Sequence, residues 1–334
     1  MTAVSLGDMA KSFMLRRHTV DLKQNLDRLS NEVATGRVGD TAAHVSGDLV
    51  PIAGIDASLA RLKGYGAVTS EAGIFAGAMQ TALGTVDTVA SDLGNTLISA
   101  STGGSEALVD AAGRDAEQKL KTSLSVLNTR FGDRSLFAGT RTTNAAVIDS
   151  DTLLATLTSV VSGAVSAQDV ETAVNNWFDD PAGYDSMAYL GGDPLAAVQV
   201  APGEDAQLDV TAKDPALRDT IKALAMAALL NRGVLAGEST GRQDLARRAG
   251  LSLLENKTDR TNVAARLGLA EAQIDAAATR NSNEVSVLQM ARNGITEADP
   301  YETATRLNET EAQLEKIYAL TARLSRLSLL DYLR

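Results

Sequence analysis

Few residues in this 334-residue chain could carry out chemistry. The chain has no cysteine, which excludes disulfides, cysteine-type zinc sites, iron–sulfur clusters and thiol nucleophiles. There are two histidines: His18 lies among the polar positions of an expected helix, and His44 lies in an expected loop. A catalytic triad or a histidine-based metal site would need one of them beside distant carboxylates. We interpret both as solvent-exposed and expect no catalytic residue.

Two pairs of adjacent acids are the remaining candidates, because paired carboxylates can catalyse acid–base reactions or bind calcium. Asp179–Asp180 and Glu204–Asp205 each lie next to a proline, where turns favour acidic residues for structural reasons. Gly191–Pro194 is typical of a turn, and no phosphate-binding glycine loop or calcium loop occurs. We therefore expect no metal, no cofactor and no enzymatic activity.

The net charge of −11 comes from one segment. Residues 145–215 contain twelve acids and a single base, Lys213, while the rest of the chain contains 30 acids and 30 bases. This distribution includes no basic patch and disfavours a nucleic-acid partner. No run approaches 18 apolar residues, and the first 20 residues lack the apolar core of a signal peptide. We expect no membrane span and no cleaved signal peptide.

Apolar residues recur every three or four positions near both chain ends, which predicts a coiled-coil-like seam. Asp299 and Pro300 form a start signal for the last helix, as N-cap and first helical residue. A helix over 300–332 cannot bury its apolar stripe against itself, so we expect the two ends to pair and to drive assembly. The predicted assembly residues are Leu15, Leu22, Leu26, Leu29, Val33, Leu314, Ile317, Leu320, Leu324 and Leu327.

Further helices are expected inside these two arms, while 36–54, with four glycines and Pro51, predicts an irregular connection. Asn281 and Glu284 fall on the seam of the longest of these helices, where polar residues cost stability but can fix register. The expected helical stretches are 55–100, in which glycines permit a bend at 64–66, then 106–132, 216–232 and 243–297.

The middle of the chain differs from both flanks. Residues 141–216 contain four of the six prolines and the only tryptophan, and apolar and polar residues alternate around Pro202–Gly203. This pattern predicts a hairpin within a small α+β insertion. The fold class is therefore mainly α, with long antiparallel, coiled-coil-like helices at both ends. The predicted domains are a terminal assembly domain (1–40 and 300–334), a helical inner domain (41–140 and 216–299) and an acidic α+β outer domain (141–215) facing solvent.

Several segments resemble one known family. The run DPYETATRLNETEAQLEKIYALTARLSRLSLLDYL (299–333) is similar to the C-terminal helix of the flagellin superfamily, and its ending is most like the hook-associated proteins of the hook–filament junction. LDRLSNEVATGRV (26–38), FGDRSLFAGTRTTNAAV (131–147) and VQVAPGEDAQLDVTA (198–212) resemble further family segments in the same order. The stretch after Gly36 departs from the family pattern.

This resemblance implies a structural subunit of the bacterial flagellum, located outside the cell. It implies export through the flagellar type III apparatus and polymerisation through paired terminal helices. The implied partners are other copies of the chain, a hook-associated protein on the hook side, flagellin on the filament side, and an export chaperone. Two alternatives remain open: a filament flagellin, which shares this architecture, and a non-flagellar helical coiled-coil binding module.

Overall fold

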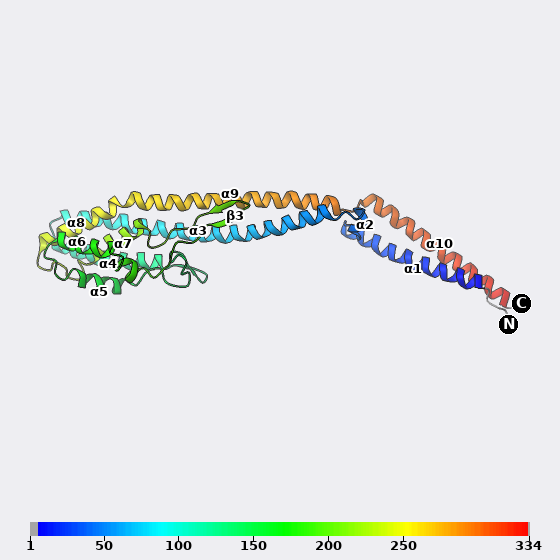
Figure 1. Cartoon of the computed structure of the whole chain (residues 1–334), viewed down its shortest axis with the longest axis horizontal. Coiled ribbons are helices and arrows are strands. Elements are labelled where there is room, and N and C mark those ends of the chain that lie inside the picture. The colour runs from blue at the N-terminus through cyan, green and yellow to red at the C-terminus, as the bar shows by residue number, and fades with distance from the viewer. Residues whose placement is uncertain (1–5, 333–334) are drawn as a thin grey trace. The chain divides into compact units, whose positions relative to one another are not determined.

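The computed structural model describes the backbone of residues 6–332 and the side chains of residues 9–323. Long helices dominate, as Figure 1 shows. The predicted mainly α fold with a small α+β insertion is confirmed. The helices are α1 (Leu6–Thr35), α2 (Thr41–His44), α3 (Val50–Thr102), α4 (Glu106–Leu127), α5 (Ser150–Val160), α6 (Ala167–Asp179), the π-helical turn η1 (Tyr184–Ala188), α7 (Pro215–Ala228), α8 (Ser239–Glu255), α9 (Lys257–Thr296) and α10 (Pro300–Tyr332). The antiparallel strand pairs are β1 (Arg130–Phe131) with β2 (Arg134–Ser135), and β3 (Val198–Ala201) with β4 (Glu204–Ala206).

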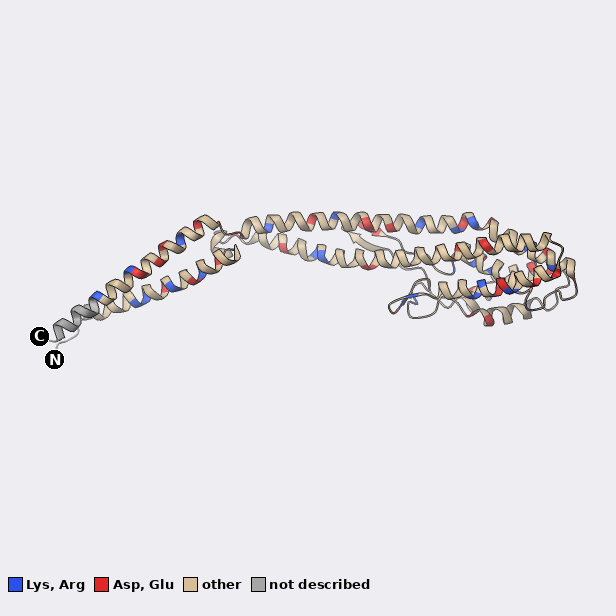
Figure 2. Cartoon of the chain, turned by 180° about the vertical axis from the view of Figure 1, so that it is seen from behind, with Lys and Arg blue, Asp and Glu red and all other residues tan. Residues whose placement is uncertain are grey.

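The chain divides into two compact units. Unit 1 is built from both ends, residues 1–61 and 283–334, and unit 2 is built from residues 62–282. Acidic and basic residues are interspersed along the helices of both units (Figure 2). The finer division into three domains stays a prediction.

Small aliphatic side chains form the core of unit 2. Met79, Leu93 and Leu97 of α3 are fully buried, and α7 is buried on nearly every side. Glycines set the closest approach of α3 and α8. A Cβ on Gly94 would lie 3.0 Å from the Leu254 side chain, and one on Gly250 would lie 3.1 Å from the Gly94 carbonyl oxygen. A larger residue at this crossing would push the two helices apart.

The single helix predicted over 243–297 is wrong, because Asn256 separates α8 from α9. The buried Asn256 amide donates to the Ala216 carbonyl oxygen at 2.8 Å and to the Thr220 hydroxyl at 2.9 Å. Arg260, which is only 4% exposed, donates to the Leu253 carbonyl oxygen at 2.9 Å and to the Asp87 carboxylate at 2.8 Å. The bond from Arg260 satisfies the Leu253 carbonyl oxygen in the last turn of α8.

Other predicted boundaries also shift. The irregular connection predicted over 36–54 contains α2, and α3 already begins at Val50, because Pro51 fits the first turn of a helix. The helix then continues through 64–66. The helix predicted to reach residue 132 ends at Leu127, where the Asn128 side chain bonds both the N–H and the carbonyl of Val147 at 2.9 Å.

The insertion has an aromatic centre. The Phe178 ring stacks on Tyr184 with centroids 5.2 Å apart, and Trp177 meets Phe178 edge-on at 5.0 Å. The Tyr184 hydroxyl donates to the Ala212 carbonyl oxygen at 2.9 Å. Burial raises the pKa of Tyr184 well above its usual value, so this donor stays protonated at any ordinary pH.

Gly183→Ala is expected to destabilise unit 2. A Cβ on Gly183 would overlap the Trp177 backbone carbonyl oxygen, which cannot move without displacing the end of α6. We expect a loss of about 1–3 kcal/mol in the free energy of unfolding, measured by urea denaturation followed through the fluorescence of Trp177. Gly163→Ala is the control, since no atom lies within 4 Å of the added Cβ. Equal stability of the two variants would contradict this packing.

Candidate assembly interface

The two ends of the chain pair as antiparallel helices, α1 with α10. Leu22 and Leu29 are buried in this pair, at 6% and 3% exposed. Val33 and Leu320 remain 46% and 47% exposed. The other predicted assembly residues Leu15, Leu26, Leu314 and Ile317 are half-buried, and the side chains of Leu324 and Leu327 lie outside the described residues. The seam therefore brings the predicted residues to one helix pair, and their role in assembly stays a prediction.

The seam between α1 and α10 is shallow. On the α10 side it contains two buried threonines, Thr303 and Thr310, among the half-buried aliphatic residues. Among the described side chains no ion pair joins the two helices, and Lys23 Nζ lies 5.9 Å from the Tyr318 ring centroid. A two-helix seam of this kind is a weak core by itself.

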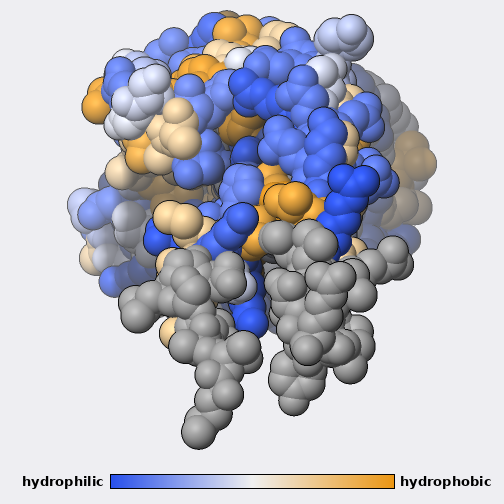
Figure 3. All heavy atoms as spheres, turned by 90° about the vertical axis from the view of Figure 1, so that its right-hand side faces the viewer, coloured by the Kyte–Doolittle hydropathy of each residue, from blue (hydrophilic) through white to orange (hydrophobic). Residues whose placement is uncertain are grey.

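A second apolar stripe runs along α1. Met9, Phe13 and Val20 are 58%, 68% and 51% exposed. At 3.6 residues per turn, they lie about 170° around the helix from Leu22 and Leu29. This stripe was not predicted from the sequence, although Phe13 and Val20 stand one heptad apart. Figure 3 looks onto the end of the molecule that carries the termini, and apolar surface is visible there among hydrophilic residues.

The connections next to this helix pair are tied together by backbone bonds. Val38 donates its N–H to the Thr296 carbonyl oxygen, and Ala298 donates to the Gly36 carbonyl oxygen, both at 3.0 Å. Gly36 has a φ of +68°, which is typical of the residue that follows the end of a helix. The Glu32 carboxylate is buried there. It accepts from Arg28 at 2.7 Å and from the Gly39 N–H at 2.8 Å.

Glu32→Ala is expected to loosen this connection. The substitution removes the charged acceptor of the Gly39 N–H and of the Arg28 guanidinium, at a cost of about 1.5–3 kcal/mol. We expect faster hydrogen exchange at the amides of Val38 and Gly39, with exchange in unit 2 unchanged. Asp27→Ala is the control, because Asp27 is exposed on the same helix. Unchanged protection at both amides would show that Glu32 does not hold the connection.

Many acids of the segment 145–215 form ion pairs with basic residues elsewhere in the chain. Six of its twelve acids form ion pairs in which the acidic side chains stay partly exposed, and the outward-facing position of the segment stays a prediction. Five of the pairs reach bases outside residues 145–215. The pairs are Asp151–Arg232, Glu171–Arg248, Asp179–Arg218, Asp185–Lys213, Glu204–Arg280 and Asp214–Arg266.

A polar ladder on α9 holds the predicted hairpin, which the structure confirms as β3–β4. Arg266, Gln273 and Arg280 stand seven residues apart and bond Asp214, the Asp205 carbonyl oxygen and Glu204 in turn. Asn281 donates to the Val200 carbonyl oxygen at 2.9 Å. Asn281 is buried, as its seam position predicted, whereas the same prediction for Glu284 is wrong because Glu284 is exposed.

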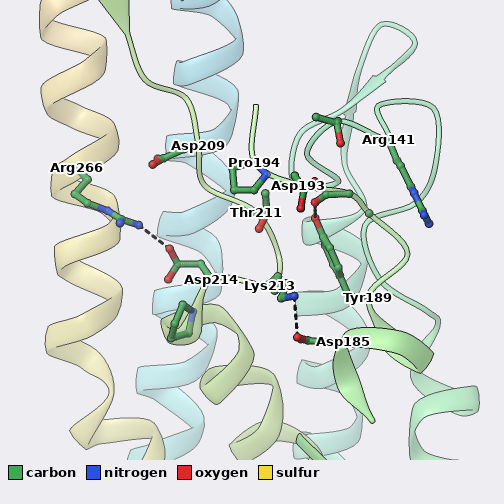
Figure 4. Close-up of a pocket in the computed structure, with 14 residues that line it drawn as sticks. Arg141, Asp185, Tyr189, Asp193, Pro194, Asp209, Thr211, Lys213, Asp214 and Arg266 are labelled. Carbon is green, nitrogen blue, oxygen red and sulfur yellow. Dashed lines mark hydrogen bonds and ion pairs between the residues drawn. The ribbon is translucent and has the colours of Figure 1, made fainter. Parts of the chain in front are cut away.

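A cavity of about 630 Å³ lies between the insertion and α9 (Figure 4). Its charged groups largely neutralise one another: Lys213 pairs with Asp185 at 2.8 Å, and Arg266 pairs with Asp214 at 2.6 Å. The Tyr189 hydroxyl donates to the Gly192 carbonyl oxygen, and burial raises the pKa of Tyr189. The lining presents no nucleophile beside a base. The adjacent acids Glu204 and Asp205 are in the hairpin next to the polar ladder.

The remaining sequence candidates are not brought together. His18 and His44 are both exposed, and Asp179 and Asp180 end α6. No cluster of three or more potential metal ligands occurs among the described residues. In the same part of the chain, none of the helices has the length and apolar character to cross a membrane.

Comparison with known proteins gave two kinds of match. Residues 253–333, which include α9 and α10, match the family model for the bacterial flagellin C-terminal helical region. The fold resembles the crystal structure of Bacillus cereus FlgL, with a TM-score of 0.51 and 16% identity over 70% of this chain and 96% of that chain. A putative flagellar hook-associated protein from Vibrio parahaemolyticus aligns with a TM-score of 0.49 and 11% identity over 72% of this chain and 94% of that chain. No curated protein matches the sequence.

Proposed function

We propose that this flagellin-like chain is a structural subunit of the bacterial flagellum that joins the hook to the filament. Its resemblance to the flagellin superfamily, predicted from the sequence, is confirmed by the C-terminal match and by the fold. The prediction of a structural protein rather than an enzyme is confirmed with it. The ending of the C-terminal run, which is most like the hook-associated proteins, supports a hook-associated protein over a filament flagellin.

The observation that carries the proposal is the helix pair at the chain ends. It leaves an apolar stripe of α1 uncovered and Leu320 half-exposed. Exposed apolar surface of this kind marks an interaction site. The partners we propose are further copies of the chain, a hook-associated protein on the hook side, flagellin on the filament side, and an export chaperone before assembly. The chain then works outside the cell.

Immunogold electron microscopy of intact flagella tests the proposal. The antibody is raised against the exposed residues of α5 and α6, which belong to unit 2 and not to the terminal pair. Label confined to the hook-proximal end is the expected result. Label along the whole filament would make the chain a filament flagellin, and absence of label from flagella would favour a non-flagellar coiled-coil module.

A further inference from the structure

Helices α3 and α9 run antiparallel and side by side through unit 2 (Figure 1). Asp87 of α3 bonds Arg260 of α9. Closer to residue 62, a Cβ on Gly73 of α3 would lie 3.7 Å from the Ile274 side chain of α9. Both helices rise about 1.5 Å per residue, so they stay in one register along their contact.

The apolar core between these two helices ends before unit 2 does. Its last members are Ala72 on α3 and Ala277 on α9, which lie at the same level in this register. From Ala277 up to residue 295, Asn281 is the only buried side chain of α9 in the described part of the chain. Asn281 donates to the Val200 carbonyl oxygen, and this bond holds α9 at one point, whereas apolar packing would hold it along a face.

At the level of Asn281, α3 contains two glycines that no packing contact requires. Gly64 and Gly66 are exposed, and no other part of the chain lies within 4 Å of a Cβ built on either of them. Glycine in a helix costs stability relative to alanine, because its backbone is freer to leave the helical conformation. The Thr69 hydroxyl donates to the carbonyl oxygens of Tyr65 and Gly66 at 3.0 and 3.2 Å, and bonds of this type bend helices.

We propose that α3 and α9 bend together at a joint, which we define as residues 62–71 of α3 and 278–282 of α9. Leu62 is the one buried apolar side chain among these residues, all of which the structure describes. Helices open and bend most easily where buried apolar contacts are few, whereas the core that begins at Ala72 stays rigid. In a structural subunit, such a joint lets neighbours hold the two ends of α3 at different angles while the core of unit 2 keeps its packing.

Hydrogen exchange on the full chain tests the local weakness of the joint. We expect Gly64→Ala/Gly66→Ala to raise the protection factors of amides 64–70 at least about tenfold, since each change removes a glycine from the helix. Gly84→Ala is the matched control, because Gly84 is equally exposed and free of neighbours on the same helix but lies beside the core. We expect the control to leave the protection of amides 64–70 unchanged. No rise in the double variant, or an equal rise in the control, would overturn the joint.

Distances between pairs of spin labels on α3 test the bending itself. The natural chain has no cysteine, so labels attach only to the cysteines that are introduced. The pair Ala57→Cys/Thr85→Cys spans the joint, and the control pair Ser70→Cys/Ser99→Cys, of nearly equal separation in sequence, lies beside the core; all four positions are exposed. We expect a broader distance distribution across the joint than in the control, and we expect the two alanine substitutions to narrow it. Equal widths, or no narrowing, would contradict a joint at this place.

The joint and the proposed function fail separately, because both measurements use the single chain in solution. A broad distance distribution across the joint, combined with immunogold label along the whole filament, would retain the joint and reject the junction role. A narrow distribution across the joint, combined with label confined to the hook-proximal end, would reject the joint and retain the junction role.

Discussion

Leu320→Asp is expected to abolish incorporation of the chain into flagella while leaving its expression and the folding of unit 2 unchanged. Leu320 is 47% exposed in the single chain, so the new carboxylate stays hydrated there and costs little stability. In the assembly that we propose, the same position becomes covered, and an unpaired buried carboxylate costs several kcal/mol. The measurement is the amount of the variant in sheared flagella relative to the amount in the culture medium, by immunoblot.

Leu108→Asp is the matched control for this experiment. Leu108 is 50% exposed and lies on α4 in unit 2, so the chemical change and the starting exposure are nearly the same. We expect normal incorporation of this variant. Normal incorporation of Leu320→Asp as well would show that the terminal pair does not carry the assembly contact.

Asp87→Ala is expected to destabilise unit 2 by about 3–5 kcal/mol. The Arg260 guanidinium is almost completely buried and bonds the Asp87 carboxylate at 2.8 Å, so removing Asp87 leaves a buried positive charge without its counterion. Thermal and urea unfolding, followed by circular dichroism, measure the loss. Asp92→Ala, at an exposed position of the same helix, is expected to change the unfolding free energy by less than about 0.5 kcal/mol.

A double variant makes this prediction sharper. The double variant Asp87→Ala/Arg260→Met removes the buried positive charge, whereas Asp87→Ala alone leaves this charge without a counterion. We therefore expect the double variant to lose less unfolding free energy than Asp87→Ala alone. A double variant at least as unstable as the single one would mean that Asp87 acts through some other contact.

The long helices were predictable because their signal is local. Apolar residues at three- and four-residue spacing fix which face is buried, and Asp299 with Pro300 fixes where α10 begins. The hairpin around Pro202–Gly203 was predictable for the same reason, since turn residues and alternation lie within a few positions of one another. The burial of Leu22 and Leu29 in the helix pair followed from this pattern, and their role in assembly stays a prediction.

Features that depend on distant residues were not predictable. At the break between α8 and α9, Asn256 bonds Ala216 and Thr220, and Arg260 bonds Asp87. These partners are all distant in sequence, so the local pattern gives no sign of the break. In the sequence alone, the polar ladder of α9 is indistinguishable from a solvent-exposed helix face. Its function in holding the hairpin depends on residues 200–214, which are distant in sequence. The stripe of Met9, Phe13 and Val20 was overlooked for another reason: only three residues form it, and the stronger seam on the opposite face of α1 dominates the pattern.

The construction of unit 1 from both chain ends has a kinetic consequence. During synthesis from the N-terminus, α1 has no partner helix until residues 300–332 have been made. By then all residues of unit 2, which ends at residue 282, are present and can fold. Pairing α1 with α10 then closes a loop of more than 260 residues. Contacts between residues so far apart in the sequence form slowly, unless unit 2 has folded first and shortened the loop. We therefore expect the helix pair to be the last part of the chain to fold and the first to open.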